Sequence, residues 1–308
     1  MTDSGWHRIE EPLMGTEVSV ELWHEDVAQG MAAARAVIAE YHRINQRMST
    51  YREDSEISAL NRTAAERPFV TSPELFNLVA RSLELGRLSG GCFDITYDSI
   101  GALYDLRAGV VPAAGEIRDR LALIDYRSVV LDPAHLTIRF ARPGMRINLG
   151  GIGKGYAVER GAAILRARGV RHALLNAGGD SRVVGDRRGQ PWMIGVRDPR
   201  ARDQVIARLP LVDEAVSTAG DYERYFDRDG VRYHHILDPA TGTPSYGVKG
   251  VTVIGPDATM TDGLDTAIFV MGVRKGMELI AKLPGYEAIV VDDDGRLYYS
   301  DGLQTPSG

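Results

Sequence analysis

Three side chains with oxygen donors stand at helical spacing in residues 261–272. Asp262, Asp265 and Thr266 occupy positions i, i+3 and i+4, so on a helix they share one face near its N-terminus. Two carboxylates and a hydroxyl are hard ligands, suited to Mg²⁺ or Ca²⁺ and poor for zinc. Substrate phosphates would complete such a coordination shell. The same pattern is compatible with a helix N-cap followed by a solvated charge.

A second segment, residues 147–155, places the cation Lys154 among four glycines. Glycines let a backbone turn tightly and approach a ligand closely. Apolar residues at helical spacing follow Lys154 and stop at Gly169, and the N-terminus of a helix behind a glycine loop favours phosphate. A P-loop is excluded because Gly155 follows the lysine, and a Rossmann fingerprint because Tyr156 stands where its last glycine is required. The alternative is that the glycines only permit a sharp turn and close packing.

Two adjacent histidines lie in residues 231–237, a predicted strand that follows the hairpin signal Asp229-Gly230. Because side chains alternate between the faces of a strand, His234 and His235 cannot both enter one site. An imidazole with an ordinary pKa of about 6.5 is a suitable base at neutral pH. A histidine in the core or on the surface, without any catalytic role, is the alternative for either residue.

Composition bounds the remaining possibilities. With 308 residues, 44% of them hydrophobic, the chain can bury the core of one large domain or two modest ones. A net charge of −6 provides no basic surface for nucleic acid. Cys92 is the only cysteine, which excludes an internal disulfide and a thiolate zinc site. No stretch of about 18 apolar residues and no signal peptide or lipid-acceptor cysteine is present. We expect no membrane span and a cytoplasmic protein, or an exported one if a leader has been removed.

The predicted helices and strands that position these residues follow one another in an irregular order. Residues 14–23 alternate as a half-buried strand, and a hairpin is predicted for 128–140. Helices are predicted for 28–45, for a segment that opens at Asp54-Ser55-Glu56, and for 72–88, where Pro73 follows a Ser72 cap. Further strands are expected at 170–177, 192–197, 205–210, 215–221 and 251–254. The lack of regular βα alternation favours an α+β fold with a largely antiparallel sheet.

Seven segments together resemble the ApbE-type FAD:protein FMN transferases. They are MGT at Met14, MSTYREDSEISALN at Met48, GCFD at Gly91, INLGGIGKGYAVE at Ile147, NAGGD at Asn176, YHHILDPATGTP at Tyr233 and TDGLDTAIFVMG at Thr261. The segments occur in the family's order over nearly the whole chain. The resemblance implies one domain over residues 1–308 with an α+β, T-fold-like architecture. In it, mostly antiparallel sheets with packed helices form two related lobes around a flavin cleft.

The resemblance also implies an activity and a site. The activity is Mg²⁺-dependent transfer of FMN from FAD to a threonine of a target protein, with release of AMP. His235 matches the catalytic histidine, and Lys154 would neutralise charge on the bridging oxygens. The implied Mg²⁺ ligands are Asp262, Asp265, Thr266 and the carbonyl of Gly151. The implied FAD contacts are Met14, Tyr51, Cys92, Phe93, Asp94, Asn148, Lys154 and the backbone near Ile236.

Two positions depart from the family pattern. Asn148 stands where the family usually has aspartate, and Gly153 stands where alanine is common before the lysine. Two other functions would use the same pocket. One is an Mg²⁺-dependent FAD pyrophosphatase, in which water replaces the threonine and gives FMN and AMP. The other is a flavin-binding protein without turnover.

Overall fold

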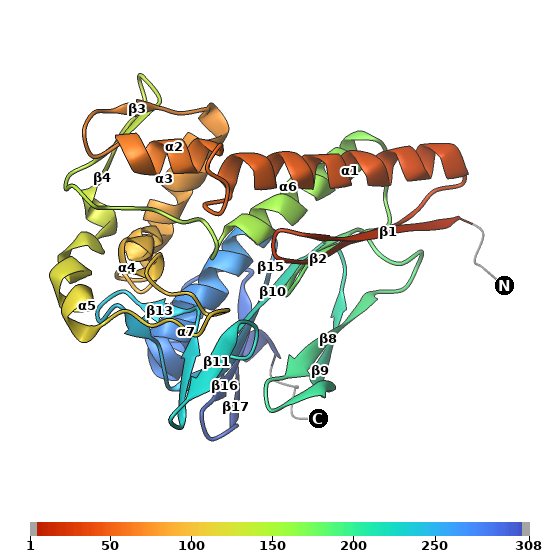
Figure 1. Ribbon diagram of the computed structural model, residues 1–308. Coiled ribbons are helices and arrows are strands. Elements are labelled where there is room, and N and C mark those ends of the chain that lie inside the picture. The colour runs from red at the N-terminus through yellow and green to blue at the C-terminus, as the bar shows by residue number, and fades with distance from the viewer. Residues whose placement is uncertain (1–4, 304–308) are drawn as a thin grey trace.

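An eight-stranded sheet runs through the centre of the protein (Figure 1). The computed structural model describes residues 5–303. All pairings between neighbouring strands of this sheet are antiparallel, which confirms the predicted α+β class. The strand order is β1 (Trp6–Leu13), β2 (Thr16–Trp23), β6 (Ala173–Ala177), β7 (Asp180–Val184), β10 (Ala215–Gly220), β15 (Val248–Gly255), β16 (Glu287–Asp292) and β17 (Leu297–Tyr299).

Three long helices cover one face of this sheet: α1 (Val27–Met48), α6 (Gly153–Ala167) and α7 (Ala258–Ile280) (Figure 1). The alternation predicted for the second strand is present, since Val18, Val20 and Leu22 are fully buried in the core beneath the helices. The hairpin of β8 (Trp192–Asp198) and β9 (Ala201–Leu211) packs on the other face in a second, smaller core. The centre of the molecule therefore has three layers.

The segment between α1 and α6 folds beside these layers, at the left of Figure 1. It contains α2 (Glu56–Thr63), β3 (Phe69–Val70), α3 (Pro73–Leu88), η1 (Ile95–Tyr97), α4 (Asp98–Gly101), α5 (Ala114–Arg120), η2 (Leu121–Leu123), η3 (Tyr126–Ser128), β4 (Val129–Asp132) and β5 (Thr137–Phe140). The predicted serine caps are confirmed: Ser55 accepts from the backbone of Ser58, and Ser72 from that of Leu75. The predicted hairpin is the β4–β5 pair.

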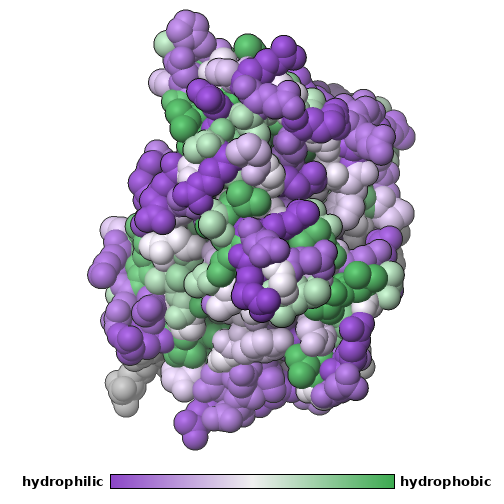
Figure 2. All heavy atoms as spheres, turned by 60° about the vertical axis from the view of Figure 1, so that its left-hand side comes forward, coloured by the Kyte–Doolittle hydropathy of each residue, from purple (hydrophilic) through white to green (hydrophobic). Residues whose placement is uncertain are grey.

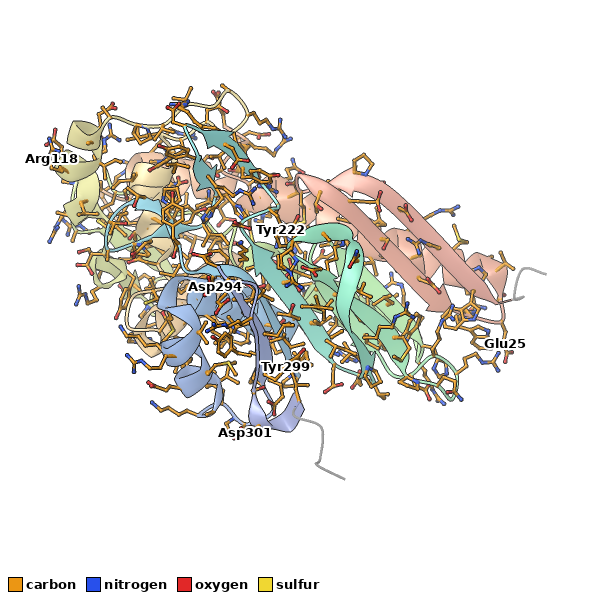
Figure 3. All side chains as sticks on the ribbon, turned by 90° about the horizontal axis from the view of Figure 1, so that it is seen from below. Glu25, Arg118, Tyr222, Asp294, Tyr299 and Asp301 are labelled. Atoms are coloured by element: carbon orange, nitrogen blue, oxygen red, sulfur yellow. The ribbon has the colours of Figure 1, made fainter. Side chains whose placement is uncertain are left out.

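Short paired strands complete the chain: β11 (Tyr225–Arg228) with β12 (Val231–His234), and β13 (Leu237–Asp238) with β14 (Thr243–Pro244), before the final η4 (Asp301–Leu303). Seen from below, Tyr222 lies near the middle of the molecule, where the chain leaves β10 for β11, while Glu25 and Arg118 lie at opposite ends (Figure 3). One side of the surface mixes hydrophobic and hydrophilic residues without separating them (Figure 2). Among residues 5–303, no helix is both long and apolar enough to cross a membrane.

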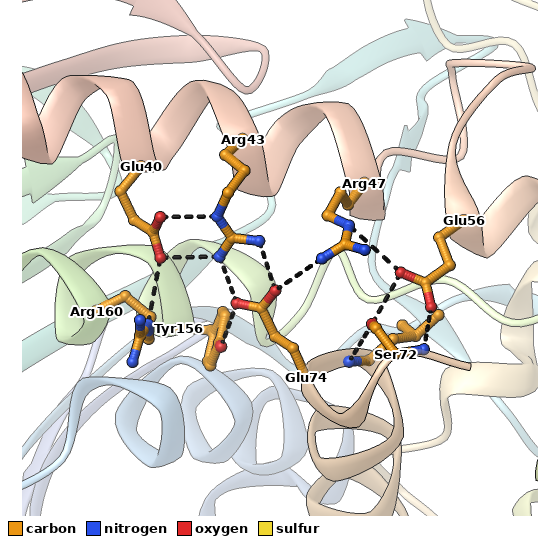
Figure 4. Close-up of polar contacts among 9 residues, drawn as sticks. Glu40, Arg43, Arg47, Glu56, Ser72, Glu74, Tyr156 and Arg160 are labelled. Carbon is orange, nitrogen blue, oxygen red and sulfur yellow. Dashed lines mark hydrogen bonds and ion pairs between the residues drawn. The ribbon is translucent and has the colours of Figure 1, made fainter. Parts of the chain in front are cut away.

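A network of charged side chains ties α6 to the helices around it (Figure 4). Arg43 on α1 donates to both Glu40 and Glu74, each from two nitrogens. Tyr156, in the first turn of α6, donates its hydroxyl to Glu74 at 2.7 Å, and Arg160 donates to Glu40 at 3.3 Å. The start of α6, which carries Lys154, is thereby held against α1 and α3.

Replacing Arg43 with methionine is expected to lower the free energy of unfolding by about 1 to 3 kcal/mol, because two half-buried carboxylates lose their shared partner. The value allows for solvent screening at the partly exposed guanidinium. Arg43 lowers the pKa of Glu40 and of Glu74, so its contribution is present above their unfolded pKa values and is lost as pH falls through the folded ones. Urea unfolding at pH 7 and pH 3.5 measures this. Arg35→Met, at an exposed position of the same helix, is the control, and an equal loss in both variants would contradict the prediction.

Candidate metal and flavin site

Three buried carboxylates meet where α7 passes the start of β7. Asp262 and Asp265 come from α7, and Asp180 is the first residue of β7. One oxygen from each lies within 4.8 Å of the others, and the three residues are 0 to 2% exposed. The N-cap of α7 is Asp257, whose side chain accepts from the backbone of Met260. The alternative of an N-cap with a solvated charge is therefore wrong for Asp262 and Asp265.

The other two predicted metal ligands lie beside this cluster. Thr266 donates its hydroxyl to Oδ1 of Asp265 at 3.2 Å. Gly151 faces the same hydroxyl, because a Cβ added to Gly151 would lie 3.3 Å from Oγ1 of Thr266. The structure thus brings together all four residues of the predicted set, and their role as Mg²⁺ ligands stays a prediction.

Gly155 allows α6 to approach α7 closely. A Cβ at this position would collide with the carbonyl oxygen of Ala258 and would lie 2.6 Å from Cβ of Asp262. The bare backbone instead donates from N of Gly155 to Oδ2 of Asp262 at 2.8 Å. The close-packing interpretation of the glycine cluster therefore holds at Gly155. At Gly153 there is open space, so alanine and glycine both fit there.

Lys154 extends into the carboxylate cluster. Its ammonium forms an ion pair with Asp180 and approaches Oδ1 of Asp262 at 3.4 Å. Burial alone would lower the pKa of Lys154, but the charges of Asp180 and Asp262 outweigh burial and raise it. Lys154 therefore keeps its positive charge at neutral pH. Its contact with FAD stays a prediction, and its ammonium lies against the carboxylates of Asp180 and Asp262.

Asp180 is a residue of this cluster that was not among the predicted site residues. Its segment, NAGGD, contributes to the family resemblance, but no local spacing relates Asp180 to residues on α7, 82 positions further along the chain. The strand pairing of β7 with β6 and β10 brings it there. The available signal in the sequence was an aspartate directly after two glycines.

The cluster carries more negative than positive charge. Burial, followed by the charge of Asp262, raises the pKa of both Asp180 and Asp265. Oδ1 of Asp180 is buried and has no hydrogen-bond partner among the described residues. Three convergent carboxylates, a hydroxyl and an unpartnered oxygen suit a hard divalent cation, which would relieve the repulsion that raises these pKa values.

The two histidines differ as the strand alternation predicts. His234 is 1% exposed, its Nε2 pairs with the carbonyl of Ser245 at 2.8 Å, and its ring packs edge-on against Phe269 and Tyr246. His235 is exposed. The predicted strand end is wrong, because β12 stops at His234 rather than continuing to Leu237. The backbone of Ile236 turns instead to donate to Nδ1 of His234 at 3.3 Å.

His235 is a neutral imidazole at pH 7. Desolvation by the surrounding protein, followed by the positive charge of Arg224, moves its pKa below the ordinary value, and Lys154 acts in the same direction. Water at the exposed ring offsets part of this effect without reversing it. The ring is therefore available as a proton acceptor, the state that a general base requires.

Arg224 connects His235 to the predicted flavin contact Met14. The backbone of His235 donates to the carbonyl of Arg224 at 3.3 Å, and the Arg224 guanidinium donates to the carbonyl of Gly15 at 3.4 Å. Met14 and Gly15 form the β1–β2 turn, with Met14 in the left-handed region at φ 55°. The sequence interpretation did not assign a role to Arg224, because nothing local relates it to this turn.

The remaining predicted FAD contacts differ in environment. Tyr51 is 88% exposed, Phe93 is buried against Gly151, and Cys92 is half-buried. Asp94 already accepts hydrogen bonds from the backbones of Thr96 and Tyr126. The backbone of Ile236 is engaged at both ends, with its carbonyl accepting from Ser245. Their contacts to FAD stay predictions.

Asn148 is positioned by a buried acid. Its amide nitrogen donates to Oδ1 of Asp98 at 3.1 Å and to Oγ1 of Thr50 at 3.0 Å, while its Oδ1 accepts from N of Gly150 at 2.8 Å. An aspartate in its place would turn a carboxylate toward Asp98. This contact gives a physical reason for an amide rather than a carboxylate at position 148.

Asn148→Asp is expected to destabilise the protein by about 1 to 3 kcal/mol at pH 8 and by less at pH 5. Burial already raises the pKa of Asp98, and a second carboxylate would raise it further. A carboxyl with a raised folded pKa costs nothing below its unfolded pKa and costs progressively more as pH rises toward the folded value. Urea unfolding at both pH values measures the deficit, and Asp98→Asn in the same variant should remove it. A deficit independent of pH would contradict the prediction.

Comparison with known proteins shows the family to which the chain belongs. The profile of the ApbE family matches residues 14–290. The FAD:protein FMN transferase of Treponema pallidum is 33% identical over 95% of this chain and 86% of its own length, and that of Vibrio cholerae is 31% identical over 95% and 90%. The crystal structure of an ApbE protein from Thermotoga maritima superposes with a TM-score of 0.90 at 34% identity, covering 96% of this chain and 97% of that one. The chain belongs to the ApbE family.

Proposed function

We propose that this protein is an Mg²⁺-dependent FAD:protein FMN transferase that moves FMN from FAD to a threonine of a target protein and releases AMP. The observation that carries the proposal is the buried cluster of Asp180, Asp262 and Asp265 with Lys154 at its centre. Its arrangement suits a cation that holds a pyrophosphate. The relatives that align over 95% of the chain are themselves named for this reaction.

The metal ligands, through the cation that they hold, and Lys154 would together supply the positive charge that the reaction needs. Phosphoryl transfer needs negative charge to be neutralised on the bridging and leaving oxygens. Bound Mg²⁺ would act as a Lewis acid toward the pyrophosphate. Asp262, Asp265, Thr266 and the carbonyl of Gly151 are the groups that would hold it. Lys154 adds a second positive charge at the same place and needs no proton exchange to do so.

His235 supplies the proton acceptor. A threonine hydroxyl is a weak nucleophile and gains from a base within hydrogen-bond reach. His235 is exposed, neutral and fixed through its backbone to Arg224, so a hydroxyl from another protein can reach it. The bond between the FMN phosphorus and the oxygen that bridges to AMP breaks, the threonine oxygen takes its place, and His235 accepts the hydroxyl proton.

One experiment separates this function from the alternatives. The protein is incubated with FAD, Mg²⁺ and a flavin-acceptor domain, and intact mass and AMP are measured. A transferase gives an acceptor heavier by one FMN with an equal amount of AMP, and an acceptor with its threonine replaced by alanine abolishes both. AMP without modified acceptor identifies the pyrophosphatase, and neither product identifies a flavin-binding protein. Chelation of the metal should stop the reaction.

A further inference from the structure

The ammonium of Lys154 lies next to the Asp262 oxygen that a metal ion would need. Oδ2 of Asp262 already accepts the backbone N–H of Gly155 at 2.8 Å. Oδ1 is therefore the oxygen left for a cation, and the Lys154 ammonium lies 3.4 Å from it. A divalent cation bound to the same oxygen would lie against the ammonium, and two positive charges at that separation repel strongly in a buried site.

Asp180 offers the ammonium a second position. It is fully buried and pairs with Lys154 through Oδ2, while its Oδ1 has no partner among the described residues. A lysine that leaves Asp262 therefore finds an unused acceptor on a carboxylate that it already contacts. Asp180 is not one of the predicted metal ligands, although one of its oxygens lies within 4.8 Å of oxygens of Asp262 and Asp265.

We propose that Lys154 and the divalent cation compete for Asp262, and that Asp180 decides the competition by holding the ammonium away from the metal. Lys154 contacts both Asp180 and Asp262 and acts as their counter-ion. When the metal binds, Lys154 withdraws from Asp262 onto Asp180. Asp180 is thus a positioning residue that acts through Lys154. The inference rests on the metal dependence of the proposed function.

A double-mutant cycle with Mn²⁺ as the probe tests this, with bound and free Mn²⁺ measured by electron paramagnetic resonance in the absence of FAD and acceptor. Lys154→Met should bind Mn²⁺ roughly tenfold more tightly than the natural protein, because the competitor is gone. Asp180→Asn should bind it roughly tenfold more weakly, because the ammonium then stays on Asp262. In the double variant the affinity should return close to that of Lys154→Met, since Asp180 has nothing left to hold.

A direct metal ligand at position 180 would behave differently. Asp180→Asn would then weaken Mn²⁺ binding by the same factor with or without Lys154, and that additive result would overturn the proposal. If Lys154→Met bound Mn²⁺ no more tightly than the natural protein, that result by itself would overturn the proposal, even if the Asp180 variant failed to fold. Lys282→Met, which removes an equal charge just beyond the far end of α7, should leave affinity unchanged. Because no turnover is measured, failure of the proposed transferase activity would not affect the outcome.

Discussion

Asp262→Asn and Asp265→Asn should each lower the rate of metal-dependent FMN transfer by about 1,000-fold or more. Each carboxylate supplies a charged oxygen to a buried cluster, and loss of a metal's charge at the transferring phosphoryl group costs several kcal/mol in the transition state. Asparagine keeps the shape of the side chain and an oxygen for the backbone of Gly155. The measurement is transfer at saturating FAD over a Mg²⁺ titration, with Mn²⁺ affinity determined in parallel.

Asp257→Asn is the matched control on the same helix. Asp257 caps α7 and pairs with Arg81 at 2.8 Å, and asparagine is an equally good N-cap. This variant should keep its transfer rate. Activity that survives in either Asp262 or Asp265 variant, at any Mg²⁺ concentration, would remove these residues from the metal site. Equal losses in all three variants would instead indicate a general effect on the helix.

Local spacing made the α7 residues of this cluster predictable from the sequence. Asp262, Asp265 and Thr266 face one way because the helix period fixes their relation, and the strand period likewise separated His234 from His235. The serine caps of α2 and α3 were predictable for the same reason, since a cap depends on residues three positions away. Contacts between residues only a few positions apart follow from the helix period, the strand period or the N-cap geometry, and these can be applied without knowing the fold.

The missed relations all cross the fold. Asp180 reaches Asp262 through a strand order in which β7 pairs with β6 and β10, and no sequence period encodes that order. Asn148 meets Asp98, and Arg224 meets the β1–β2 turn, across separations of 50 and 209 residues. The early end of β12 was missed for a different reason: after His235 the chain turns so that the N–H of Ile236 donates to the side chain of His234, a local contact between side chain and backbone that competes with regular strand. Strand propensity did not reveal that competition.

His235→Ala should lower the FMN transfer rate by about 100- to 10,000-fold, the range expected when a general base is removed. FAD and Mg²⁺ binding should persist, because Lys154 and the carboxylates are held by contacts with one another and with the backbone of Gly155 rather than by the imidazole. The melting temperature should change little, since the ring is exposed. The residual rate should rise with pH, as hydroxide replaces the missing base.

His234→Ala should have the opposite effect and lower stability rather than the transfer rate. Its ring is buried between Phe269 and Tyr246 and satisfies the carbonyl of Ser245 and the N–H of Ile236. Removing it leaves a cavity and two unpaired backbone groups, which together cost about 2 to 4 kcal/mol of stability. Transfer per folded molecule, measured well below the melting temperature, should stay within a few-fold of the natural protein. The ring of His234 is buried and that of His235 is exposed, so one variant should lose stability and the other chemistry. Parallel losses of rate and melting temperature in both variants would mean that His235 only supports the strand and that the base lies elsewhere.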